Sequence, residues 1–172
     1  MPHIIVHSMK RIIPIFAVVL GLTLSSCLDT KSHYTPEISL SQFYTGSGDS
    51  LLFMYDEMAG MYRVDSLLVG DTLHFSVGFA SLGNNMVSTH IDWDTNYVDM
   101  WGYFTQDMLD VMLPTSDTAT LDIYLPVGYN YVGLPLWIVP KKAGGTLLKF
   151  TAVSDSKYSP KELPLMLGIV TE

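Results

Sequence analysis

The stretch TLHFSVGFA, residues 72–80, decides the fold class of this chain. Its large apolar residues alternate with small or polar ones, so that Leu73, Phe75, Val77 and Phe79 fall on one face of an extended strand. Because successive side chains of a strand point to opposite faces, the pattern predicts a strand with one face in a core and the other in water. Such alternation is typical of antiparallel sheets.

Segments of this kind recur along residues 36–170, separated by clusters of Gly, Asn, Asp, Ser and Pro. Helical spacing of apolar residues occurs only in 105–113, which favours one or two helical turns there. Short β-branched and aromatic runs between turn clusters predict an all-β sandwich or barrel. The candidate strands are 36–45, 50–55, 61–68, 72–80, 86–94, 98–104, 119–125, 134–139, 146–154 and 162–170. Since some of these segments can merge or prove to be loops, we expect about seven to nine strands.

The first 26 residues have the features of an export signal. Lys10 and Arg11 precede IIPIFAVVLGLTL, residues 12–24, a run of thirteen residues without a charge. A basic segment followed by an apolar one and then by small residues is typical of a secretory signal. Thirteen helical residues cover only about 20 Å of the ~30 Å hydrocarbon core, so a cleaved signal is favoured over a permanent membrane helix. Translation of this signal can start at Met1 or at Met9.

Cys27 is the only cysteine in the chain, and it follows Leu24, Ser25 and Ser26. This tetrad resembles a bacterial lipobox, which implies that Cys27 becomes the lipidated N-terminus of the mature protein. The two or three acyl chains that such a cysteine carries would hold the protein on a membrane, because one chain alone binds only reversibly. An ordinary signal peptide with an incidental cysteine is the alternative.

We therefore expect a signal peptide at 1–26, a lipidated polar tether at 27–36 and one β-sandwich domain at 37–172. Without the signal, the chain keeps seven basic and 17 acidic side chains, a formal charge of −10. Nucleic-acid binding depends on Lys and Arg contacts to phosphate, so this charge excludes nucleic-acid partners.

Two phrases carry a resemblance to a known class of domain. VGDTLHFSV at 69–77 and AGGTLLKFTAVSDS at 143–156 resemble the strand-entry phrases of immunoglobulin-like bacterial extracellular domains. The resemblance implies an immunoglobulin-like antiparallel β-sandwich whose closing strand is 162–170. Pro164 in that strand suits an edge or a bulge, because proline cannot donate to the ladder.

With its lipobox, the whole chain resembles the small lipoproteins of Bacteroidetes-type cell envelopes. The resemblance implies a lipid-anchored protein of the bacterial cell envelope, at the outer membrane. Whether it faces the cell surface or the periplasm stays open, because only Asp29 of the expected acidic residues follows the cysteine before Lys31. Within the domain, Ile91 and Trp93 are expected to face the core, as a mid-sandwich tryptophan does in many such folds.

The segment HIDWDTNYVD, residues 90–99, is the candidate ion site. Asp92, Asp94 and Asn96 have the spacing of the first three ligand positions of a calcium loop. Tyr97 replaces the glycine of that motif, and no glutamate stands at its twelfth position. A solvated strand face that runs into an Asx-rich turn is the competing interpretation. The sequence suggests no cofactor other than calcium.

Aromatic residues are the other binding candidates, since exposed rings can stack on sugars or anchor a protein partner. Most of those on strands are expected in the core, which makes the loop residues Tyr97, Tyr129 and Tyr131 the better ligand-binding candidates.

Catalytic motifs are absent from the sequence: it has no G-x-S-x-G elbow, no H-E-x-x-H, no P-loop and no thiol after the anchor. A Ser-His-Asp set could be assembled, but nothing in the sequence positions one. The sequence therefore favours a non-enzymatic binding or assembly module of the envelope. A glycan-binding accessory lipoprotein of a surface polysaccharide-uptake system is the alternative, and the expected partners are an envelope protein or a glycan.

Overall fold

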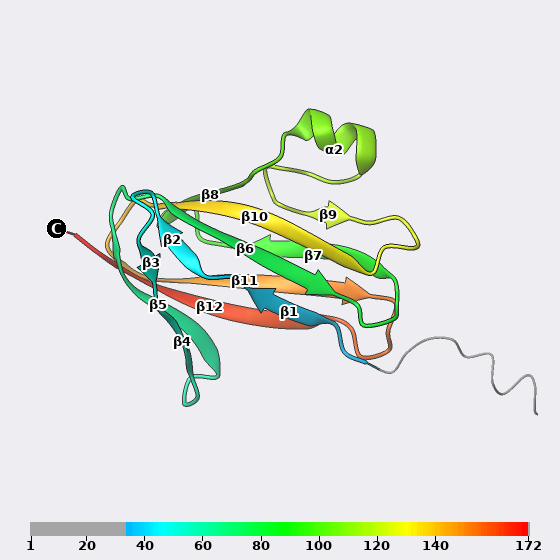
Figure 1. Cartoon of the computed structure of the whole chain (residues 1–172), viewed down its shortest axis with the longest axis horizontal. Helices are drawn as coiled ribbons and strands as arrows, with labels where there is room; N and C mark the ends of the chain where they lie inside the picture. Colours follow the sequence, from blue (N-terminus) through cyan, green and yellow to red (C-terminus); the bar gives the residue numbers. More distant parts are fainter. Residues whose placement is uncertain (1–33, 172) are drawn as a thin grey trace, which may run out of the picture. The chain divides into compact units, whose positions relative to one another are not determined.

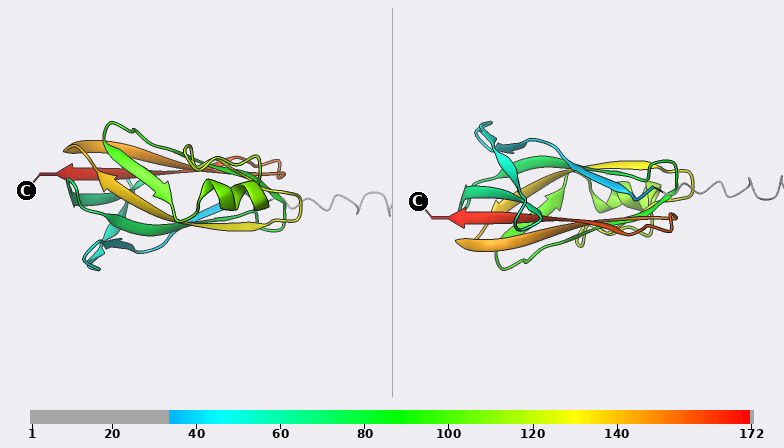
Figure 2. Two further views of the ribbon diagram at one scale, coloured as in Figure 1. Left: turned by 90° about the horizontal axis from the view of Figure 1, so that it is seen from above. Right: turned by 90° about the horizontal axis from the view of Figure 1, so that it is seen from below.

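The computed structural model describes residues 34–171, which form a two-layered β-sandwich (Figures 1 and 2). The predicted signal, its lipobox residues Leu24, Ser25 and Ser26, and Cys27 lie outside the described residues. The all-β class is confirmed, with twelve strands and the short helix α2 in the described part of the chain. Within 34–171, no helix is long and apolar enough to cross a membrane.

Sheet A has six strands in the order β3-β2-β6-β10-β8, and β1 pairs with β6 alongside β2. Its strands are β1 (Glu37–Leu40), β2 (Phe43–Thr45), β3 (Ser50–Leu51), β6 (Leu73–Ala80), β8 (Val98–Gly102) and β10 (Tyr131–Pro140). Sheet B also has six strands, in the order β4-β5-β12-β11-β7-β9. They are β4 (Phe53–Asp56), β5 (Met61–Leu68), β7 (Met86–Asp92), β9 (Ile123–Tyr124), β11 (Gly144–Ser154) and β12 (Lys161–Val170).

Twelve strands exceed the expected seven to nine because all ten candidate segments contain a strand and two of them are each interrupted. The segment 36–45 breaks at Ser41 and Gln42 into β1 and β2, and 50–55 breaks at Leu52 into β3 and β4. The first break separates two strands that both pair with β6 in sheet A, and the second lies where the chain crosses from sheet A to sheet B.

The core lies between the two sheets and begins at the stretch that predicted the fold. All four apolar residues of β6 that alternate are buried: Leu73, Phe75, Val77 and Phe79. Phe75 meets Phe150 of β11 edge-on, with 6.1 Å between ring centroids, so one aromatic pair joins the two layers. Burial of such rings is the main favourable term in a domain without disulfides.

One strand pair departs from the antiparallel expectation: β5 and β12 run parallel. The last strand is also internal, between β11 and β5, so of the two alternatives for Pro164 an edge strand is wrong; the ladder of β12 with β5 does have a register shift, between Leu167 and Ile169. Pro164 is nevertheless accommodated, because the ladder with β5 begins only at Leu165 and β12 is paired on one side at the proline.

Two further expectations are modified by the fold. Ile91 is buried, but Trp93 follows the end of β7 and is only half-buried against the rim of the core, not in its middle. The helical turns expected at 105–113 are present as α2 (Gln106–Met112), with Thr105 as N-cap accepting from the Met108 N–H at 3.3 Å. The segment that carries α2 connects β8, an edge of sheet A, with β9, an edge of sheet B (Figure 1).

Candidate ligand-binding groove on sheet A

Trp137 stands at the centre of an aromatic cluster on the outer face of sheet A. It pairs in register with His74 on β6 and with Trp101 on β8. Its ring meets His74 at 5.4 Å, Trp101 at 6.0 Å and Tyr103 at 5.0 Å between centroids, each time edge to face. This is a favoured geometry for aromatic pairs, so the cluster stabilises itself before any ligand arrives.

An open groove of about 470 Å³ runs beside this cluster. We call it the Trp137 groove; its lining residues are Ser41, Gln42, Tyr44, His74, Phe75, Ser76, Tyr103, Pro135, Leu136 and Trp137. No Asp, Glu, Lys or Arg is among them. The groove is therefore neutral, with aromatic walls and a few polar groups, which is the usual composition of a small-ligand site.

The break between β1 and β2 forms one wall of the Trp137 groove. At Ser41 the strand leaves the regular ladder, yet its N–H still donates to Ser76 O at 2.9 Å. The Ser41 hydroxyl replaces the missing carbonyl and accepts from Ser76 N–H at 2.8 Å. Beside it, the Gln42 side-chain amide donates to Leu51 O, which fixes this side chain against β3. The wall is thus held by side-chain hydrogen bonds instead of strand pairing.

The opposite wall depends on a glycine at the end of β8. A Cβ added to Gly102 would lie 2.2 Å from the Phe104 ring, so only glycine lets Phe104 fold back against the core. Tyr103 then stays on the outer face, where its N–H donates to Pro135 O at 3.0 Å. The His74 ring makes no hydrogen bond to another described residue, so both nitrogens of this half-buried ring can bind a ligand.

The aromatic residues predicted from the sequence do not form this site. Tyr97 lies against Lys142 and Gly144 in the loops beyond β10, while Tyr129 and Tyr131 lie at the opposite end of that strand. The prediction placed most strand aromatics in the core and therefore favoured loop rings, whereas Trp137 occupies an outward position on β10. The alternation of Leu134, Leu136 and Ile138, all buried, was the signal that could have revealed this.

The predicted calcium ligands are engaged with other groups. Asp92 pairs with Lys149 at 3.2 Å. Asp94 Oδ1 accepts from the backbone N–H and from Nδ2 of Asn96, both at 2.8 Å, and the backbone bond holds the pKa of Asp94 below its usual value. Within residues 34–171, no cluster of three or more His, Cys, Asp or Glu side chains could hold a metal ion. The arrangement is that of an Asx turn at the end of β7.

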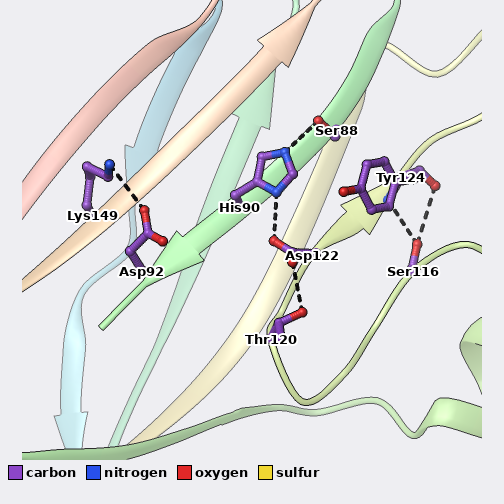
Figure 3. A network of polar contacts seen from close by, with 8 residues as sticks. All are labelled: Ser88, His90, Asp92, Ser116, Thr120, Asp122, Tyr124 and Lys149. Atoms are coloured by element: carbon purple, nitrogen blue, oxygen red, sulfur yellow. Dashed lines mark hydrogen bonds and ion pairs between the residues drawn. The ribbon is translucent and has the colours of Figure 1, made fainter. Parts of the chain in front are cut away.

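A Ser-His-Asp network does exist, on the outer face of sheet B (Figure 3). Ser88 Oγ lies 2.8 Å from His90 Nε2, and His90 Nδ1 lies 2.6 Å from Asp122 Oδ1. The atoms follow the order of a hydrolase triad, but Ser88 is only 3% exposed and its strand is paired on both sides. A substrate carbonyl cannot reach this hydroxyl. The network instead fixes the loop before β9 against β7.

Comparison with known proteins identifies no family for this chain. No family model and no curated protein matches the sequence. Among solved structures, the chain is similar to a FixG-related protein from Vibrio parahaemolyticus, with 10% identity over 79% of this chain and 97% of that one and a TM-score of 0.38. It is also similar to the ASH/PapD-like domain of human CEP192, with 7% identity, 64% and 80% coverage and a TM-score of 0.33.

A third similar structure is AggA, the major subunit of aggregative adherence fimbriae type I from Escherichia coli. Here the identity is 12%, the coverage 81% of this chain and 99% of that one, and the TM-score 0.33. At such identities the likeness concerns the fold alone: a β-sandwich distantly similar to PapD-like and fimbrial domains.

Proposed function

We propose that this chain is a lipid-anchored envelope protein whose immunoglobulin-like sandwich binds a ligand in the Trp137 groove without chemical conversion. The observation that carries the proposal is the groove itself, in which packed aromatic rings lie beside polar side chains on the outer face of sheet A. The N-terminal sequence up to Cys27 supports the anchor.

The composition of the groove favours a neutral carbohydrate as ligand. The lining holds no Asp, Glu, Lys or Arg, so the groove offers no permanently charged side chain to pair with a carboxylate, phosphate or ammonium group. The ring faces of Tyr44, Tyr103 and Trp137 match the apolar C–H faces of a sugar ring. His74 and Ser76 can exchange hydrogen bonds with hydroxyl groups. A glycan-binding role also agrees with the alternative drawn from the sequence.

A glycan array probed with the full mature chain tests this function, followed by calorimetric titration of the best ligand. We expect Trp137→Ala and Tyr44→Ala to weaken binding at least tenfold. The matched control is Tyr124→Ala, because Tyr124 is 42% exposed on sheet B and Tyr44 is 46% exposed in the groove. Uniform silence on neutral glycans, or an equal loss in the control, would contradict the proposal.

The anchor is tested separately. Cys27→Ala should abolish palmitate labelling and release the protein from the membrane fraction. Continued labelling of this variant would refute the lipobox interpretation and leave the groove proposal untouched.

A further inference from the structure

The inference concerns the end of the sandwich where the described chain begins (Figure 1). Four segments meet there, and we call them together the entry end: 34–36, 81–85, 126–130 and 155–160. They lie opposite the end at which β12 finishes.

Asn85 joins three of these segments through its side chain and backbone. Its N–H and Nδ2 donate to the two oxygens of Asp155 at 2.9 and 3.0 Å, and its Oδ1 accepts from Gly128 N–H at 3.0 Å. The Tyr34 carbonyl accepts from Ser156 Oγ at 2.9 Å. The loops are therefore fixed as one surface.

This surface is apolar and aromatic. Its exposed large side chains are Tyr34, Leu82, Val127, Tyr129 and Tyr158. Tyrosine is enriched at membrane–water interfaces, where the ring enters the headgroup region and the hydroxyl stays hydrated.

Charge distinguishes the entry end from two other exposed apolar patches, on helix α2 and on the β4–β5 hairpin. It holds one acid, Asp155, whose oxygens accept from Asn85, and one base, Lys157. Helix α2 exposes Met108, Val111 and Met112 but carries Asp107 and Asp110 with no base. The β4–β5 hairpin exposes Met54, Tyr55 and Met58 beside Asp56 and Glu57. In a chain of formal charge −8, the entry end is the one of these three patches that has zero net charge. Anionic lipid repels the other two.

We propose that the entry end rests on the headgroup region of the bilayer that holds the lipidated Cys27. This inference rests on the proposed anchor. Tyr34 is seven residues after Cys27, so the chain between them can span at most about 25 Å. The Trp137 groove then stays in water, because Trp137 lies six residues along β10 from Tyr131, about 20 Å from this end.

The test uses the full lipidated protein in phosphatidylethanolamine–phosphatidylglycerol vesicles that contain a headgroup-nitroxide lipid. A fluorophore is attached to one introduced thiol: Val127→Cys at the entry end, Val111→Cys on α2, or Ala143→Cys in the β10–β11 turn. The two valines are matched, at 89% and 85% exposed. We expect quenching at 127 to exceed quenching at 111 and at 143 several-fold.

A second pair of variants tests the tyrosines. Tyr129→Ser should lower the quenching at 127 at least twofold, whereas Tyr55→Ser on the hairpin should leave it unchanged. Equal quenching at 127 and 111, or none at any position, overturns the proposal. It is also overturned if the N-terminal peptide mass shows an unmodified Cys27 and the protein fails to float with the vesicles. That mass distinguishes failure of the anchor from failure of the docking surface.

Discussion

The aromatic cluster can be tested without a ligand, through the contact between Tyr103 and Trp137. Their centroids are 5.0 Å apart with the ring planes at 82°, a nearly ideal edge-to-face pair. Such pairs contribute about 0.5–1.5 kcal/mol beyond the area they bury. Because Tyr103 is largely exposed, we expect a value near the middle of that range, about 1 kcal/mol.

The measurement is a double-mutant cycle of Tyr103→Ala and Trp137→Ala. The free energy of unfolding is taken from urea titrations followed by far-UV circular dichroism, because fluorescence changes when Trp137 is removed. The control cycle combines Trp137→Ala with Tyr124→Ala, which lies on the outer face of the other sheet. Its substitutions should add to within about 0.3–0.5 kcal/mol. If the Tyr103–Trp137 coupling is no larger than that of the control, the rings do not hold each other and the groove is not preformed.

Three further predictions concern stability. Phe150→Ala should lower the free energy of unfolding by about 3–5 kcal/mol, measured by urea titration, because the buried ring joins the two sheets. Asp94→Asn should lower the free energy of unfolding near neutral pH but not in acid. The hydrogen bond from the Asn96 N–H lowers the pKa of Asp94 in the folded state. The stability that the Asp94 carboxylate contributes is therefore present above the unfolded pKa of about 3.9 and is lost as the pH falls through the lower folded pKa. Unfolding titrations from pH 7 to 2 should show the two proteins converging at the acid end; a constant difference would contradict it. His90→Ala should lower the free energy of unfolding by about 1–2 kcal/mol, and Asp122→Asn should lower it less because the asparagine keeps one hydrogen bond. The rate of amide hydrogen exchange in β9 should rise in both variants. An unchanged exchange rate would refute the role of the network.

Local sequence patterns predicted the strands well because the alternation of apolar residues within a strand identifies the face that is buried. The alternation in 72–80 is matched by burial of every residue that it assigned to the core. Strand pairing is a different problem, since the parallel contact of β5 and β12 joins segments about a hundred residues apart. No periodicity within either segment encodes that neighbour.

The sequence analysis predicted neither the Trp137 groove nor the Ser88–His90–Asp122 network, and the reasons differ. The outward position of Trp137 could be inferred from the alternation of Leu134, Leu136 and Ile138, but the prediction favoured loop aromatics over strand aromatics. The Ser88–His90–Asp122 network was not readable, because His90 and Asp122 are 32 residues apart and meet only when β9 docks on β7. Predicting such a contact requires the topology, which a single sequence leaves open.

Tyr131 shows why exposure alone does not identify a ligand-binding ring. It lies over the cross-strand pair Gly78 and Gly133, with its hydroxyl 3.0 and 3.2 Å from where their Cβ atoms would be. The ring therefore covers two strands that lack side chains of their own, as an aromatic residue does when it rescues glycine in a sheet. Around Trp137, by contrast, the paired position is filled by His74 and the rings border a hollow.

This difference gives opposite expectations for two similar substitutions. Tyr131→Ala should lower the free energy of unfolding by about 1 kcal/mol, since cross-strand side-chain contacts contribute on that scale, and it should leave ligand affinity unchanged. Tyr44→Ala should weaken ligand binding and change the free energy of unfolding little, because the Tyr44 ring borders the groove and covers no glycine. Loss of binding in the Tyr131 variant would place the ligand across the glycine pair and shift the site toward the entry end.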